Sequence, residues 1–273
     1  MILKIKNFLL PLYRFLSKEY ILLNENSIKQ PIASKDEYMK IFDDAKNVYY
    51  KEIDSIQKSL GYDLDFDWLN DLALHTQVCV KKSRINYQHG RLLYSYLRNY
   101  IKINSHNFFN IFETGTARGF SSICMSKALN DSGKKGKIYT VDILPNDKEM
   151  YWNTIDDNEK KKTRIELLSK WPNEQKNISF LTGNTTQVLR NINIDRINFA
   201  FLDAEHTYES IMSEFNYVHS RQKTGDIIFF DDVTPNLFPD ICKAIKKIET
   251  KKEYLIEYLN ITDQRGYAIA KKL

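Results

Sequence analysis

Residues 112–119 read Phe-Glu-Thr-Gly-Thr-Ala-Arg-Gly, and this stretch decides the fold expected for the chain. The chain has only nine glycines, and two of them, Gly115 and Gly119, fall here. Gly115 permits a tight bend and close approach of a ligand to the backbone, while Gly119 lets the following helix pack close to the strand. The stretch therefore predicts a turn from a first strand into a helix, whose exposed amides attract an anionic group.

Around this turn, from Asn107 onward, short apolar runs alternate with helical patterns. The first five runs are separated by helices, which predicts an α/β fold with a doubly wound, mostly parallel, Rossmann-like sheet. Only residues 260–265 separate the last two runs, too few for a helical crossover, so these runs should form an antiparallel hairpin at the C-terminus. The seven predicted strands are 108–112, 137–141, 178–181, 197–202, 226–230, 254–259 and 266–270.

The first hundred residues follow a helical pattern instead. Ser34 and Glu37 form a capping-box sequence, apolar residues then recur at helical spacing to Ile56, and Gly61 is a natural stop. Further helical patterns cover 68–73 and 92–100. The sequence therefore predicts two domains: a helical N-terminal appendage over residues 1–104 and a sheet domain over residues 105–273.

Composition excludes several classes of protein. The 273 residues are 42% apolar, enough to bury a full core, and no apolar run is long enough to span a membrane. A net charge of +5, scattered along the chain, does not predict a nucleic-acid partner. Cys79, Cys124 and Cys242 show no CxxC pairing, which argues against a disulfide framework or a zinc site and favours a reducing compartment, hence a cytoplasmic protein.

The N-terminal segment is basic and apolar but lacks the features of a signal peptide. Pro11 interrupts its apolar stretch, Arg14 follows at once, and no small-residue cleavage site is present, so secretion is rejected. We expect a helix that packs on the domain or on a second subunit of a homo-oligomer. The alternative is a membrane-surface helix, in peripheral contact with the inner face of the membrane.

An acid lies at the end of the strand that follows the glycine turn and its helix. Asp142 ends the second predicted strand, where a carboxylate can bind the two hydroxyls of a ribose. A glycine turn alone has a purely structural reading, but the order strand, ExGxxxG, helix, strand and acid favours a nucleoside-bearing cofactor. Ala117 stands where a GxGxxG motif has its middle glycine, which disfavours a dinucleotide.

Three aspartates follow the fourth and fifth predicted strands. Asp203 comes after one, and Asp231 and Asp232 come after the other, so all three should meet at the carboxyl edge of the sheet. Their mutual repulsion predicts a hard divalent ion, Mg²⁺ first, although capping of the next helices is the structural alternative. His206 lies three residues beyond Asp203 and could accept a hydroxyl proton at neutral pH, or could be a bystander.

From Phe108 to the C-terminus the chain resembles the class I S-adenosylmethionine-dependent methyltransferases. The resemblance implies that S-adenosylmethionine is the cofactor and that Asp142 holds its ribose. It further implies that residues after the third strand flank the adenine, although Gly183-Asn184 is also an ordinary turn. The cofactor-binding residues carried over in this way are Glu113, Gly115, Thr116, Gly119, Asp142, Gly183, Asn184 and Thr185.

The pattern Asp-x-x-His-x-Tyr-Glu with a later Asp-Asp resembles the metal-dependent O-methyltransferases that act on sugars, including macrolide-sugar and polysaccharide-associated enzymes. The resemblance implies that Asp203, Asp231 and Asp232 hold Mg²⁺ or another divalent cation, that the metal grips neighbouring substrate hydroxyls, and that His206, with Asp203, is catalytic. Catechol-type enzymes often have Asp-Asn where this chain has Asp231-Asp232.

The expected function is therefore Mg²⁺-dependent O-methylation of a sugar or glycan-related acceptor, with a role in polysaccharide biosynthesis. The alternatives are a catechol-like small-molecule acceptor and a non-catalytic scaffold that keeps the fold. A nucleic-acid methyltransferase is disfavoured because no Asn-Pro-Pro-aromatic motif follows the fourth strand. Residues between Asp142 and Ile178 are proposed as an acceptor lid with Tyr151 and Trp152 as stacking surfaces; burial of both aromatic residues in a core is the alternative.

Overall fold

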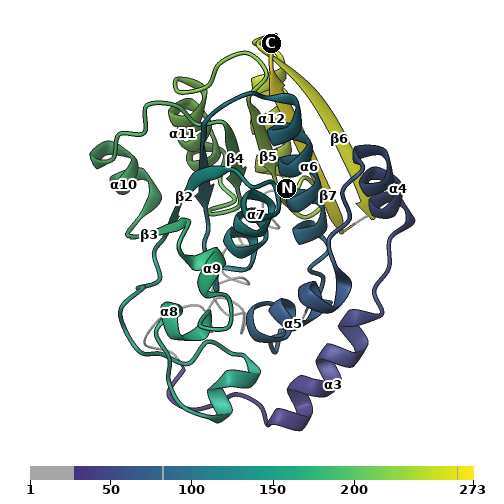
Figure 1. The fold of residues 1–273 in the computed structure, drawn as a ribbon, viewed down its shortest axis with the longest axis vertical. Coiled ribbons are helices and arrows are strands. Elements are labelled where there is room, and N and C mark those ends of the chain that lie inside the picture. Colours follow the sequence, from purple (N-terminus) through teal and green to yellow (C-terminus); the bar gives the residue numbers. More distant parts are fainter. Residues whose placement is uncertain (1–27, 82, 263) are drawn as a thin grey trace, which may run out of the picture. The chain divides into compact units, whose positions relative to one another are not determined.

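The computed structural model describes residues 28–273 except 82 and 263 (Figure 1). The predicted N-terminal amphipathic helix lies outside the described residues. Contacts divide the chain into two compact units. In the described part, the first unit comprises residues 28–49, 65–87 and 144–170, and the second comprises residues 50–64, 88–143 and 171–273. Among the described residues, no helix is long and apolar enough to cross a membrane.

The second unit is built on a seven-stranded sheet, as predicted. The strand order is β3-β2-β1-β4-β5-β7-β6. The pairs among β1 to β5 are parallel, whereas β7 is antiparallel to both β5 and β6, so the predicted C-terminal hairpin is confirmed. The bounds are β1 Phe108–Thr114, β2 Lys135–Asp142, β3 Ile178–Thr182, β4 Phe199–Leu202, β5 Ile227–Phe230, β6 Tyr254–Thr262 and β7 Arg265–Lys272.

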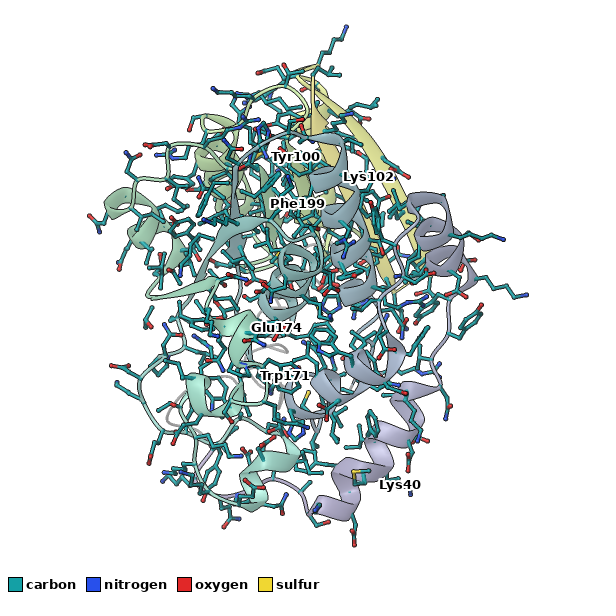
Figure 2. All side chains as sticks on the ribbon, viewed as in Figure 1. Lys40, Tyr100, Lys102, Trp171, Glu174 and Phe199 are labelled. Atoms are coloured by element: carbon teal, nitrogen blue, oxygen red, sulfur yellow. The ribbon has the colours of Figure 1, made fainter. Side chains whose placement is uncertain are left out.

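Helices cover both faces of this sheet. Because successive strand residues point to opposite faces, Ala200 packs in a core with α11 and α12, while Phe201 contacts Phe229 and shares the other face with α6. Figure 2 marks Tyr100 and Lys102 on α6 and Phe199 on β4. The helices of this unit are α4 Lys51–Leu60, α6 His89–Ile103, α7 Phe120–Asp131, α9 Pro172–Gln175, α10 Thr185–Asn191, α11 Tyr208–His219 and α12 Pro239–Glu249.

The first unit is small and mostly helical. It contains α3 Lys35–Lys46, α5 Phe66–Thr76, the short 3-10 helix Ile155–Asn158 and α8 Arg164–Leu167. The predicted capping box is present, because Ser34 accepts from the amide of Glu37 and the Glu37 carboxylate accepts from that of Ser34. The helical pattern that was expected to continue to Gly61 is broken: α3 ends at the C-cap Asn47, and a second helix, α4, starts at Lys51.

The predicted acceptor lid supplies core to the first unit instead. Trp152 is 3% exposed and packs with Leu144, Met150 and Leu167, and its indole nitrogen donates to the carbonyl of Lys162 at 2.7 Å. The prediction that Trp152 offers a stacking surface is therefore wrong, because its ring is covered by its own unit.

The predicted boundary between residues 104 and 105 does not coincide with the grouping of contacts. Helix α6 belongs to the unit that contains the sheet, where Tyr100 packs edge-on against Phe109 and donates to buried Asp226 at 2.6 Å. Helix α4 lies in the same unit and is held by a hydrogen bond from Gln57 to Ser95 on α6. Whether residues 1–104 and 105–273 fold as separate domains stays a prediction.

Candidate active site

The glycine turn lies at the carboxyl end of β1, directly against the end of β4. Gly115 has φ +87°, and a Cβ atom placed on it would lie 1.9 Å from the backbone oxygen of Asp203. The amide of Asp203 in turn donates to the carbonyl of Thr114 at 3.1 Å. Only glycine fits such a contact, and the turn is therefore packed against the strand end that carries the first predicted acid.

The turn leads into α7, and one of its backbone amides is hydrogen-bonded to a neighbouring acid. Gly119 has φ +89° and caps α7, and Ala117 also has a positive φ of 45°. The amide of Ala117 donates to the Asp142 carboxylate at 2.6 Å. Asp142 is half-buried, and it joins the end of β2 to the turn, which places the predicted ribose-binding acid beside the predicted cofactor-binding turn.

Glu113 and Thr116 lie beneath the turn rather than at its surface. Glu113 is fully buried, and its two carboxylate oxygens accept from the hydroxyls of Ser121 and Ser122 in the first turn of α7. Burial raises the pKa of Glu113, against the opposing effect of these two hydroxyls. Thr116 is 2% exposed and hydrogen-bonds Thr140 on β2. Both residues hold the turn in position, and their direct contact with a cofactor stays a prediction.

The loop after β3 has a structural explanation of its own. Asn184 is the N-cap of α10, and its side chain accepts from the amide of Gln187. Gly183 has φ +146°, and Thr185 is the first residue of the helix. The ordinary turn that the sequence allowed is present here, and a contact of Asn184 or Thr185 with adenine stays a prediction.

Three side chains converge at the carboxyl ends of β4 and β5. Because Leu202 pairs with Phe230 in the parallel register, the residues that follow each strand emerge side by side. One ligand atom from each of Asp203, His206 and Asp232 lies within 4.8 Å of the other two. His206 Nε2 is 3.5 Å from Asp203 Oδ1 and 3.7 Å from Asp232 Oδ2. We call these three residues the acid group.

Asp231 is not one of these three residues. It is 4% exposed, and its Oδ1 accepts from the amide of Asp232 at 2.7 Å. That bond supports the left-handed backbone of Asp232, whose φ is +54°, a conformation that Asp tolerates better than most residues. The structure therefore brings His206, rather than Asp231, together with Asp203 and Asp232, and ligation of a metal by Asp231 stays a prediction.

The acids and the histidine shift each other's protonation. Burial raises the pKa of Asp203, and the negative charges of Asp231 and Asp232 raise it further. For His206, burial acts to lower the pKa, but the neighbouring carboxylates, Asp203 first, outweigh it and raise the pKa. A positive charge at this point is thus favoured by its surroundings.

The donor set fits a divalent cation. The His206 Nε2 atom is buried and has no hydrogen-bond partner among the residues that the structure describes, although it faces two carboxylate oxygens. Carboxylate oxygens suit a hard divalent ion that also takes oxygen from water or substrate. Asp203 and Asp232 would hold such an ion, and His206 Nε2 would lie beside it without ligating it.

Sequence reasoning missed Arg265 and Glu214. Arg265 begins β7 and lies 3.0 Å from Asp232 Oδ1; the signal was the hairpin, because a strand antiparallel to β5 starts where β5 ends. Glu214, 2% exposed on α11, accepts from Thr114 Oγ1 at 2.8 Å beneath the turn. Burial raises the pKa of Glu214 to about 7. Glu214 is one of two acids in α11, and nothing in the sequence distinguished it as a site residue.

Comparison with known proteins finds methyltransferases of the same fold. Residues 112–233 match the family described as "Methyltransferase domain". The O-methyltransferase TomG from Streptomyces achromogenes, involved in tomaymycin synthesis and solved in complex with S-adenosylmethionine, is 15% identical, with a TM-score of 0.53 over 77% of this chain and 91% of that chain. The O-methyltransferase NovP is 14% identical, with a TM-score of 0.53 over 88% of this chain and 99% of that chain. No curated protein matches the sequence.

Identities this low establish a shared fold, and residues 112–233 match the methyltransferase domain. The chain therefore has the fold of the class I, S-adenosylmethionine-dependent methyltransferases and contains a region that matches the methyltransferase domain, as predicted.

Proposed function

We propose that this chain transfers the methyl group of S-adenosylmethionine to a hydroxyl of a sugar or glycan-related acceptor, with a divalent cation, Mg²⁺ first, at the acid group. The observation that carries the proposal is the contact between Gly115 and the backbone of Asp203, because it makes the cofactor turn and the acid group neighbours. Methyl transfer requires the methyl donor and the acceptor hydroxyl to lie next to each other, and holding two reactants in this way supplies a large part of the rate acceleration.

On the donor side, each residue has a distinct task. The backbone amides around Gly115–Gly119 and the carboxylate of Asp142 would bind the cofactor, while Glu113 and Thr116 hold the turn from below. The turn ends at the N-terminus of α7, where the helix dipole favours a carboxylate such as that of the methionine part.

On the acceptor side, His206 would remove the hydroxyl proton through Nε2, which makes no hydrogen bond within the described part of the chain. The acceptor oxygen then bonds to the methyl carbon as the carbon–sulfur bond breaks, leaving S-adenosylhomocysteine. A bound divalent cation supplies a Lewis acid that makes such a hydroxyl more acidic. Phe238, whose ring meets that of His206 edge-on at 4.6 Å, orients the imidazole.

The proposal is tested by methyl transfer from S-adenosylmethionine with a labelled methyl group. We expect label in glycosides with neighbouring hydroxyls and loss of transfer when EDTA removes divalent ions. If only catechols are methylated, the acceptor is a catechol-like small molecule and not a sugar. Full transfer in EDTA would contradict the cation, and absence of S-adenosylmethionine binding in calorimetry would leave only a scaffold.

A variant separates the two halves of the site. Asp203→Asn removes a charge from the acid group, so turnover should fall by about 100-fold or more, while cofactor affinity stays within about threefold. Asp63→Asn, at an exposed position of the same unit, is the matched control and should leave both unchanged. Equal turnover of Asp203→Asn and the control would contradict the proposed role.

A further inference from the structure

One guanidinium lies among the carboxylates at the ends of β4 and β5. Arg265 Nη1 is 3.0 Å from Asp232 Oδ1 and 3.7 Å from Asp231 Oδ1, and the Arg265 side chain is 19% exposed. The antiparallel register of β5 and β7, with Phe230 opposite Ala268, places the start of β7 at this edge. Gly266 fixes it further, because a Cβ there would lie 2.4 Å from the carbonyl oxygen of Val233.

The two oxygens of Asp232 have different neighbours. Oδ1 contacts Arg265, whereas Oδ2 faces His206 at 3.7 Å and belongs to the acid group. The guanidinium therefore holds the carboxylate by one oxygen and leaves the other directed at His206 and Asp203. Asp203, Asp231 and Asp232 contribute three negative charges when ionised, and Arg265 reduces the sum to two, the charge that one divalent ion neutralises.

We propose that Arg265 is a resident countercharge that weakens divalent-cation binding at the acid group and so keeps it reversible. The inference rests on the proposed function, since it concerns the affinity of the cation site assumed there. A fixed positive charge a few ångströms from a divalent ion opposes its binding, and water screens this repulsion weakly because Arg265 is mostly buried. Without Arg265, the Asp232 side chain would be less fixed, and this would weaken cation binding. The effect is smaller than that of the charge, because only one short side chain loses order.

The test is a titration of the full chain with Mn²⁺, followed by electron paramagnetic resonance of the free ion, with no acceptor or turnover involved. Arg265→Met removes the charge and should tighten Mn²⁺ binding by about tenfold or more. Arg265→Lys keeps a charge there and should stay within about threefold of the unaltered chain. Lys127→Met, which removes a positive charge from the Lys127–Asp131 pair on α7, is the control and should have no effect.

The Mn²⁺ titrations separate failure of the Arg265 role from failure of the cation site. If Arg265→Met binds Mn²⁺ as tightly as or more weakly than the unaltered chain, the countercharge role is overturned while the cation site stands. If no form binds Mn²⁺, the cation site of the proposed function fails as well. Circular dichroism checks folding, because Arg265→Met leaves Asp231 buried without its guanidinium. Should that variant not fold, a tenfold change of affinity in Arg265→Lys, in either direction, contradicts the proposal.

Discussion

At the scale of single residues, Gly115 has the strongest constraint in the site. Its φ of +87° is strained for other residues, and any Cβ would collide with the Asp203 backbone. Gly115→Ala should therefore cost about 3 kcal/mol or more in the free energy of unfolding and abolish S-adenosylmethionine binding. Chemical denaturation and calorimetry measure the two effects.

Gly133→Ala is the matched control for that change. Gly133 also has a positive φ, +61°, but no atom of the described residues lies within 4 Å of the position that its Cβ would take. It should lose only about 1 kcal/mol, from backbone strain, and keep cofactor binding. Equal losses in both variants would show that conformation alone, and not the contact with Asp203, makes Gly115 necessary.

Glu214 gives a pH dependence with a defined sign. Its pKa is about 7 in the folded chain, above the ordinary value of 4.5, so the folded state binds the extra proton between these values. The contribution of Glu214 to the free energy of unfolding is therefore complete below pH 4.5, falls as the pH rises, and is lost above pH 7. The loss amounts to about 3 kcal/mol.

Glu214→Gln imitates the protonated form, with Thr114 and Ser210 still as partners. We expect a higher melting temperature than that of the unaltered chain at pH 8 and no difference at pH 4.5. Melting curves at the two pH values measure this, and a gain of the same size at both would contradict the shift in pKa.

At the scale of elements, strand order explains which site residues could be predicted. Asp203, Asp231 and Asp232 follow two strands whose apolar runs are plain in the sequence, so their meeting at one edge was foreseeable. Asp231 accepts from the Asp232 amide, and His206 joins the acid group in its place. This arrangement depends on the left-handed backbone at Asp232, which the sequence does not indicate, because the residue is neither glycine nor asparagine. Side-chain direction in a loop is set by such local contacts and not by hydrophobic pattern.

The helices show where hydrophobic pattern fails. One periodic run covers residues 38–56, yet the chain ends a helix at Asn47 and starts another at Lys51, with Val48, Tyr49 and Tyr50 between. β-Branched and aromatic residues have lower helix propensity, so the periodicity continued across a stretch that does not stay helical. Trp152 was misread for a similar reason, because an aromatic residue in a long insert fits a core as well as a binding surface.

Helix α6 supports a prediction about the boundary at residue 105. Eleven of its residues are buried, and its Tyr96 and Tyr100 contact Phe229 and Phe109 of the sheet. A fragment of residues 105–273 loses this cover and should be unfolded or aggregated, whereas a fragment of residues 50–273 retains α4 and α6 and should be folded. Circular dichroism and gel filtration distinguish them. A monomeric, cooperatively melting 105–273 fragment would restore the sequence-based boundary.

At the scale of the whole molecule, the contact of Gly115 with Asp203 makes the sites proposed for the methyl donor and for a divalent ion neighbours. The direct test is the nuclear magnetic resonance signal of a ¹³C-labelled methyl group in bound S-adenosylmethionine, recorded during addition of Mn²⁺, with Mg²⁺ as the diamagnetic control. We expect strong broadening of the methyl signal by Mn²⁺, and we expect this broadening to be lost in Asp203→Asn. A methyl signal that stays sharp while Mn²⁺ is bound would contradict it.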